Sequence, residues 1–131
     1  MAVKDNLIYL FGGGTSTGLL NDLWSFNTEN NTWNKHNLTG SEIKPREMHG
    51  MVYYNKYLYV FGGRLYEEID NKVYRIDTNT YNCEVVTNLP SNMCSFSYTL
   101  FKNYIILYGG TDGNVFLKDI IIYNIMSLYA S

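Results

Sequence analysis

The chain is poor in cysteine and proline and has no strong excess of one charge. Its 131 residues include two cysteines, two prolines, and 10 basic against 12 acidic residues, for a net charge of −2. Cys83 and Cys94 lack the spacing of a zinc site or of a disulfide framework, so we expect two free, mostly buried thiols in a reducing compartment. Nucleic-acid and membrane-surface binding normally require a basic patch. We therefore expect neither a nucleic acid nor a membrane as a partner.

Long apolar runs and catalytic residue patterns are also missing. Runs such as Ile120 to Tyr123 are far too short to span a bilayer, and the residues after Met1 do not form the apolar core of a signal peptide. We expect an intracellular, cytoplasmic protein. The two histidines and two cysteines suit neither a metal site nor a nucleophile elbow. The sequence therefore predicts a protein that is not an enzyme by itself and that binds no metal.

The segment GGGTSTG at 12–18 suggests a phosphate-binding loop, but it fails on detail. Gly13 and Gly18 have the spacing of a P-loop, yet Leu19 and Leu20 stand where Lys and Ser/Thr are required. The third glycine of a dinucleotide loop falls on Thr17, and a strand-like segment follows where a helix is needed. We expect no nucleotide cofactor.

The chain does contain an internal repeat, which is sought before any single motif. LIYLFGG at 7–13 returns as YLYVFGG at 57–63 and as YIILYGG at 104–110. The glycine pairs are 50 and 47 residues apart, and a second apolar segment starts 11 residues after the first glycine of each pair. The fixed offset assigns the glycines to a structural repeat. The repeated glycines are Gly12, Gly13, Gly62, Gly63, Gly109 and Gly110.

Each repeat has the composition of β structure. The segments before and after the glycine pairs are rich in β-branched and aromatic residues, and Asn55-Lys56 and Lys102-Asn103 are typical of hairpin turns. No long run keeps a helical period. We predict an all-β chain with about ten strands, three in the first repeat, four in the second and three in the third. We expect His36 and the run Glu67-Glu68-Asp70 to be solvated.

The unit resembles the kelch repeat of β-propellers, which has about 50 residues and four strands per blade. The matching features are the glycine pair closing the second strand, NDLWSFN for the third strand, NTENNTW for the following turn, and PREMHG at 45–50 for the opening of a blade. The resemblance implies one domain, 1–131, of about three four-stranded antiparallel blades at approximately 1–40, 41–89 and 90–131. Propellers have 4–8 blades, so we expect further blades from a longer chain or from a second copy.

The resemblance also sets expectations for the large side chains. Trp33 and the tyrosines are expected to wedge between adjacent blades, with Trp24, Tyr59 and Tyr74 in the core. The second repeat has Cys83 in the place of Trp33. His49 is expected to have a structural role.

Kelch propellers imply a non-catalytic protein–protein interaction module or scaffold that binds through the loops of one face. Carried onto this sequence, those positions are Thr15, Ser16, Arg46, Glu47, Met48, Arg64, Tyr66, Thr111 and Asp112. Arg64 and Tyr66 are the favoured anchors, since Arg and Tyr are enriched among binding hot spots. An ion pair of Arg64 with Glu67 or Glu68 is the structural alternative. Other possible roles are a regulatory segment of a larger enzyme, such as a kelch-fused protein phosphatase, and a cytoskeletal scaffold.

Overall fold

A computed structural model describes residues 1–129, which form strands and one short 3₁₀ helix. No helix among these residues is long and apolar enough to cross a membrane. The elements are β1 (Ala2–Lys4), β2 (Leu7–Thr15), β3 (Gly18–Asn27), β4 (Thr32–His36), β5 (Thr39–Gly40), β6 (Gly50–Tyr54), β7 (Tyr57–Phe61), β8 (Lys72–Asp77), β9 (Asn82–Asn88), β10 (Ser97–Phe101), β11 (Tyr104–Tyr108), β12 (Ile120–Asn124) and η1 (Ile125–Tyr129).

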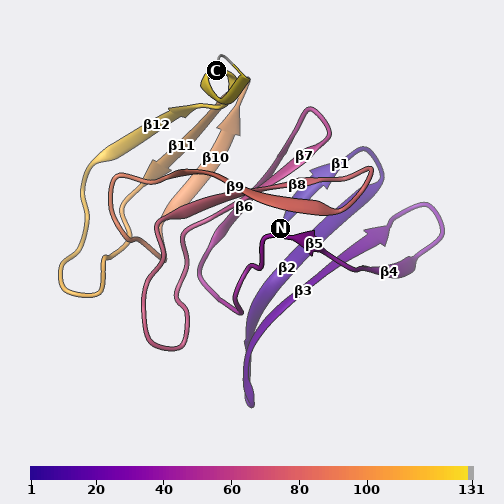
Figure 1. The fold of residues 1–131 in the computed structure, drawn as a ribbon, viewed down its shortest axis with the longest axis horizontal. Coiled ribbons are helices and arrows are strands. Elements are labelled where there is room, and N and C mark those ends of the chain that lie inside the picture. The colour runs from indigo at the N-terminus through magenta and orange to yellow at the C-terminus, as the bar shows by residue number, and fades with distance from the viewer. Residues whose placement is uncertain (130–131) are drawn as a thin grey trace.

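The strands form three antiparallel meanders that lie side by side (Figure 1). We call them blade 1 (β1–β4), blade 2 (β6–β9) and blade 3 (β10–β12). The short β5 pairs in parallel with β9 and extends the outer edge of blade 2. The blades follow one another from the indigo N-terminal end to the yellow C-terminal end, so each repeat folds as one sheet and contacts its sequence neighbour.

The prediction of an all-β chain of kelch-type blades is confirmed, and the second and third repeats have the predicted four and three strands. The hairpin turn at Asn55 and Lys56 is also confirmed, with φ of 47° and 71°. The expected three strands of the first repeat are wrong, because Ala2–Lys4 pairs with β2 as an opening strand. Three residues are too few to show a period of two, so only pairing reveals this strand.

Blade 2 is covered on both faces by its neighbours. Leu58 and Val60 of β7 lie in the apolar cluster shared with blade 1, whereas Tyr59 and Phe61 lie in the cluster shared with blade 3. Successive side chains of a strand point to opposite faces, so a continuous apolar run is what a sheet covered on both faces requires. The core of the molecule is therefore two layers, one at each contact between blades.

Blades 1 and 3 each have one face without a covering blade in the described chain. Trp33 is 53% exposed, whereas Cys83, at the same place in blade 2, is 1% exposed against blade 1. The expectation that Trp33 wedges between two blades is therefore wrong for this chain. The side chain has the right size, but its face of blade 1 points away from blade 2. Tyr59 and Tyr74 are buried as expected, and Trp24 is half-buried.

The middle glycine pair allows a test of the structural role of this motif. Gly62 has φ of 64°, and a Cβ built on it would lie 2.6 Å from the carbonyl oxygen of Met93. Gly109 has φ of 79°, but the nearest atom to its built Cβ is 4.0 Å away. We predict that Gly62→Val lowers the free energy of unfolding by at least ~1–3 kcal/mol, and by more than Gly109→Val, because only Gly62 adds a clash to the strained conformation.

Urea denaturation of the wild type and both variants measures this difference. Equal losses would show that the left-handed conformation alone requires glycine. A melting temperature that rises with ATP and Mg²⁺ in the wild type, but not in an equally stable Gly62→Val variant, would instead assign these glycines to a nucleotide site.

Candidate functional site

Two linkers join the blades, and their backbones are held in the same way. Linker 1 comprises residues 41–49 and linker 2 comprises residues 89–96. The N–H of Gly13 donates to the carbonyl oxygen of Arg46 at 2.8 Å, and the N–H of Gly63 donates to that of Met93 at 2.9 Å. Arg46 and Met93 therefore occupy equivalent positions, each bound to the second glycine of the preceding blade. The glycine pairs let the linker backbone pass close to the sheet.

The residue after each of these positions pairs with a loop of the next blade. Glu47 forms a backbone bridge with Arg64, and Cys94 forms the equivalent bridge with Thr111. The guanidinium of Arg64 also donates to the carboxylate of Glu47 at 2.9 Å. The suggested partners Glu67 and Glu68 are thus wrong, because the bridge aligns Arg64 with linker 1 and brings Glu47 closer.

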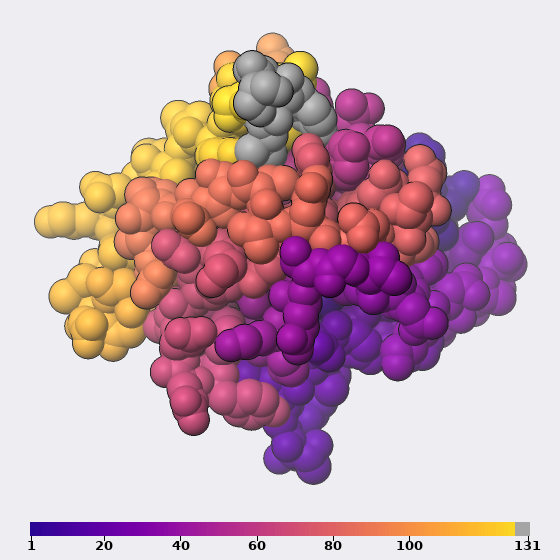
Figure 2. Space-filling view, viewed as in Figure 1, coloured from indigo at the N-terminus to yellow at the C-terminus, as the bar shows by residue number. Residues whose placement is uncertain are grey.

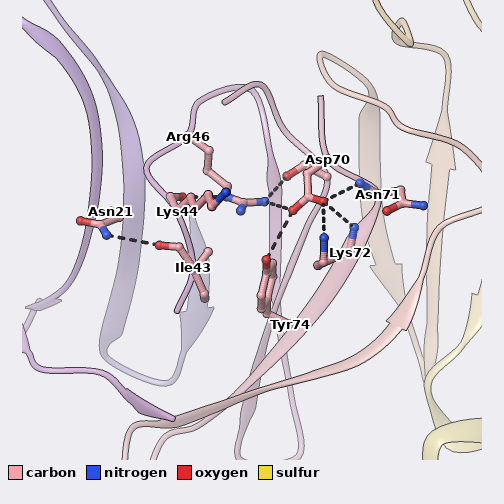
Figure 3. A network of polar contacts seen from close by, with 9 residues as sticks. Asn21, Ile43, Lys44, Arg46, Asp70, Asn71, Lys72 and Tyr74 are labelled. Carbon is pink, nitrogen blue, oxygen red and sulfur yellow. Dashed lines mark hydrogen bonds and ion pairs between the residues drawn. The ribbon is translucent and has the colours of Figure 1, made fainter. Parts of the chain in front are cut away.

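Arg46 does not lie on the surface, contrary to its predicted place among the binding residues. Its side chain is 0% exposed, and its Nη1 donates to the carbonyl oxygen of Gly62 at 2.8 Å and to the carboxylate of Asp70 at 2.9 Å (Figure 3). The guanidinium lies over the ring of Tyr74, 5.2 Å from its centre. Asp70 is buried with it, so its expected place in a solvated run is wrong. Opposite charges can be buried when they pair and hydrogen-bond.

The charge of Arg46 also controls the protonation of Asp70. Burial acts to raise the pKa of Asp70, but the hydrogen bond and positive charge of Arg46 outweigh it and hold this pKa below its ordinary value. The ion pair locks linker 1 into blade 2. Its partners are far apart in the sequence, so no local pattern could identify them.

Several predicted binding residues lie exposed on loops that contact one another across blades. Tyr66 is 64% exposed, and its hydroxyl accepts a hydrogen bond from the N–H of Leu19 in blade 1 at 2.7 Å. Met48, half-exposed, has a left-handed φ of 58°, and its carbonyl oxygen accepts the N–H of Ser95 at 3.0 Å. These bonds connect blade 1 to blade 2 and linker 1 to linker 2.

The loop between β11 and β12 carries exposed apolar residues that were not among the predicted binding residues. Thr111 donates its hydroxyl to the carbonyl oxygen of Val115 at 2.7 Å, and the carboxylate of Asp112 accepts the N–H groups of Val115 and Asn114. These backbone hydrogen bonds lower the pKa of Asp112. Phe116 is 91% exposed and Val115 is also exposed. Their signal in the sequence was an apolar pair within a loop otherwise built for turns.

Three loops thus stand out from the same side of the array, at the β2–β3, β7–β8 and β11–β12 connections (Figures 1 and 2). We call this surface, with the exposed parts of the linkers, the loop edge. Its residues are Thr15, Ser16, Glu47, Met48, Arg64, Tyr66, Thr111, Asp112, Val115 and Phe116. Eight of the nine predicted positions are on it, and their role in binding stays a prediction.

Among the described hydrogen bonds of residues 1–129, one joins a histidine side chain to a serine side chain, that of His36 and Ser25. Their side chains share a hydrogen bond at 2.7 Å, and the ring of His36 stacks on Tyr81 at 4.1 Å. His36 is therefore in β4 and packed, so the prediction of a solvated turn is wrong. Ser25 is buried, which keeps its hydroxyl from a substrate. This pair is structural.

His49 is half-buried where linker 1 meets β6. Its ring lies edge-on to Phe11 at 5.6 Å. Burial, and then the positive charge of Arg46, lowers the pKa of His49 to about 4. Phe96 takes the same place in linker 2, where it stacks on Phe61 at 5.7 Å. The site is built for an uncharged ring, which agrees with the expected structural role.

The Arg46–Asp70 pair predicts strong coupling between two substitutions. In blade 3 the equivalent positions hold Met93 and Leu117, since the N–H groups of Leu117 and Asp70 donate to equivalent glycine carbonyls. We expect Asp70→Leu to lower the free energy of unfolding by about 3–5 kcal/mol, because it leaves a buried guanidinium unpaired. Arg46→Met is expected to cost less, since Asp70 keeps Lys72 at 3.6 Å. The double variant is expected to be more stable than Asp70→Leu alone.

A double-mutant cycle by chemical denaturation measures this coupling. Additive losses in the cycle would contradict it.

His49 predicts a pH dependence of stability. Its pKa of about 4 in the folded chain lies below the ordinary value of 6.5, so the unfolded chain binds more protons between these values. Stability is then full above pH 6.5 and falls as the pH decreases toward 4. We expect His49→Phe, which copies Phe96, to make this decline shallower. Asp70 contributes its loss only at lower pH, because its pKa is already below 3.8.

Denaturation at a series of pH values tests this, with His36→Gln as the control for the other histidine. An unchanged slope in His49→Phe would contradict the prediction.

Comparison with known proteins agrees with this geometry. The family described as the KLHDC2/KLHL20/DRC7 Kelch-repeats domain matches residues 1–129. Spermatocyte protein spe-26 of Caenorhabditis elegans is 28% identical over 131 residues, which cover 94% of this chain and 22% of that protein. Kelch domain-containing protein 3 of Rattus norvegicus is 28% identical over 114 residues, covering 81% and 29%.

A further match, tRNA wybutosine-synthesizing protein 2/3/4 of rice (Oryza sativa subsp. japonica), is 36% identical over 64 residues, covering 48% of this chain and 6% of that protein. The chain thus spans less than a third of the length of each of these relatives. The repeated glycine pairs, the two equivalent linkers and the match over residues 1–129 together place this chain in the kelch-repeat family.

Proposed function

We propose that this chain is a non-catalytic protein-interaction module, a scaffold that binds a partner protein through the loop edge. The observation that carries the proposal is the exposure of Tyr66 and Phe116, at 64% and 91%, on loops fixed by hydrogen bonds. When a loop is already held in one conformation, binding costs little further conformational entropy of that loop. Aromatic residues are also common binding hot spots. Kelch-family membership supports an interaction role.

The charged part of the loop edge would add specificity. Arg64 is half-exposed although it pairs with Glu47, so a partner can reach the ion pair without first breaking it. Such rim charges affect association rate and selectivity more than affinity. We therefore propose Tyr66 and Phe116 as the main anchors and Arg64 as a secondary one.

A second candidate is a regulatory segment within a larger multidomain enzyme, of which a kelch-fused protein phosphatase is one form. The observation in its favour is the partial match to a rice protein named for a synthetic activity, of which this chain covers only 6%. In this case the loop edge would contact a catalytic domain rather than a separate protein.

Quantitative capture from a lysate of the source cells, followed by direct titration of the captured protein, tests the first candidate. We expect Tyr66→Ala and Phe116→Ala each to weaken binding by about thirtyfold or more, as for loss of a hot spot. Phe101→Ala is the matched control, because Phe101 is 57% exposed but lies at the β10–β11 turn.

Melting temperatures of all three variants must stay near that of the wild type for the comparison to hold. Partner binding that survives both loop-edge substitutions would contradict the proposed surface. If the same substitutions instead change the activity of a catalytic domain in the full-length protein, without changing capture, the second candidate is favoured.

A further inference from the structure

Blade 1 has a groove on the face that points away from blade 2. Its volume is about 530 Å³, and it is lined by Leu10, Gly12, Leu20, Asp22, Trp24 and Trp33. The lining is apolar except for Asp22, whose carboxylate accepts the indole N–H of Trp24 at 2.8 Å. The groove is separate from the loop edge, because it shares no residue with it.

In blade 2 the equivalent place is filled by a linker side chain. Val60, Gly62, Asp70, Tyr74 and Cys83 take the positions of Leu10, Gly12, Leu20, Trp24 and Trp33, fifty residues later in the sequence. Arg46 of linker 1 enters there, where it binds the carbonyl oxygen of Gly62 and the carboxylate of Asp70 and lies over Tyr74. The groove of blade 1 therefore corresponds to the place in blade 2 that is occupied by the side chain of the linker residue Arg46.

The side chain that enters a blade from its linker matches the polarity of the residue at the position of Asp70. Arg46 enters opposite Asp70 in blade 2. In blade 3, Met93 enters and Leu117 stands at that position, with both side chains in the apolar cluster between blades 2 and 3. Blade 1 has Leu20 there, and Leu20 pairs with Gly13 in the β2–β3 ladder. Blade 1 thus resembles blade 3 in the residue that selects the entering side chain.

We infer that the groove of blade 1 binds an unbranched or γ-branched apolar side chain, Met or Leu, carried by an extended polypeptide segment that enters as linkers 1 and 2 do. An arginine would find no carboxylate at the position of Asp70, because Leu20 stands there. Trp24 and Trp33 are larger than Tyr74 and Cys83, and they supply additional apolar surface for such a side chain.

Neither linker of a second copy of this chain supplies that segment. Arg46 and Met93 are both buried within their own chain, and their backbones are bound to the preceding glycines. Release of either linker would separate two blades. The occupant that we propose is therefore a segment of a partner polypeptide of different sequence, with Met or Leu at the position equivalent to Met93.

Two matched extensions of the full chain test the inference. By the repeat distances, a copy of residues 91–97 placed directly before Met1 sets a methionine in the position of Arg46 and Met93. A copy of residues 44–50 sets an arginine in the same position. Both extensions are made in the wild type and in Leu20→Asp, which copies the Asp70 position. Leu20 is exposed, so this substitution is expected to leave the fold intact.

Trp24 and Trp33 are the two tryptophans of the chain, so their fluorescence reports directly on the groove. In the wild type, we expect the methionine extension to raise the melting temperature by several degrees and to reduce acrylamide quenching of the tryptophans. The arginine extension is expected to do neither. In Leu20→Asp the order reverses, with the arginine extension giving the larger rise and the stronger protection.

Equal effects of both extensions in both backgrounds, or destabilisation by both, would overturn the inference. So would a wild-type chain without extension that dimerises in sedimentation experiments with its tryptophans protected, because a second copy would then fill the groove. The loop-edge variants do not line the groove, so failure of the proposed function would leave these results unchanged.

Discussion

The need to cover apolar sheet faces governs this structure. Blade 2 has apolar side chains on both faces, and it is stable only because blade 1 covers one face and blade 3 the other. At about 25 cal/mol per Å² of buried apolar surface, these contacts are the main source of stability, since a single isolated sheet has no core of its own. Stability in such repeat arrays depends on the contacts between neighbouring units.

The linkers turn this packing into a defined arrangement of blades. Each linker residue at the position of Arg46 or Met93 is bound through its N–H and carbonyl groups to the preceding blade and inserts its side chain into the next one. The backbone bonds are the same in both cases, whereas the side chains are a paired cation in one and an apolar residue in the other. The backbone therefore fixes the geometry, and the side-chain pair adapts to the local chemistry of the blade that the linker side chain enters.

The same linkers position the loop edge. The bridges from Glu47 to Arg64 and from Cys94 to Thr111 tie the β7–β8 loop and the β11–β12 loop to a linker, so the exposed side chains of these two loops stand on a rigid base. Surface loops can vary in sequence without affecting the sheets beneath them, which is why binding residues are common on such loops. The proposed binding residues and the residues that pack the sheets are thus different residues of one repeat.

The sequence by itself determined the all-β class, the three repeats, the strands of blades 2 and 3, and most positions of the loop edge. Fixed spacing and local composition carry this information, because each strand and turn is specified by its own residues. Only the tertiary structure decided the burial of Arg46 with Asp70, the pairing of Arg64 with Glu47, the exposure of Trp33 and the opening strand at Ala2–Lys4. Each of these depends on which segment lies against another, and contacts between residues distant in sequence leave no local pattern.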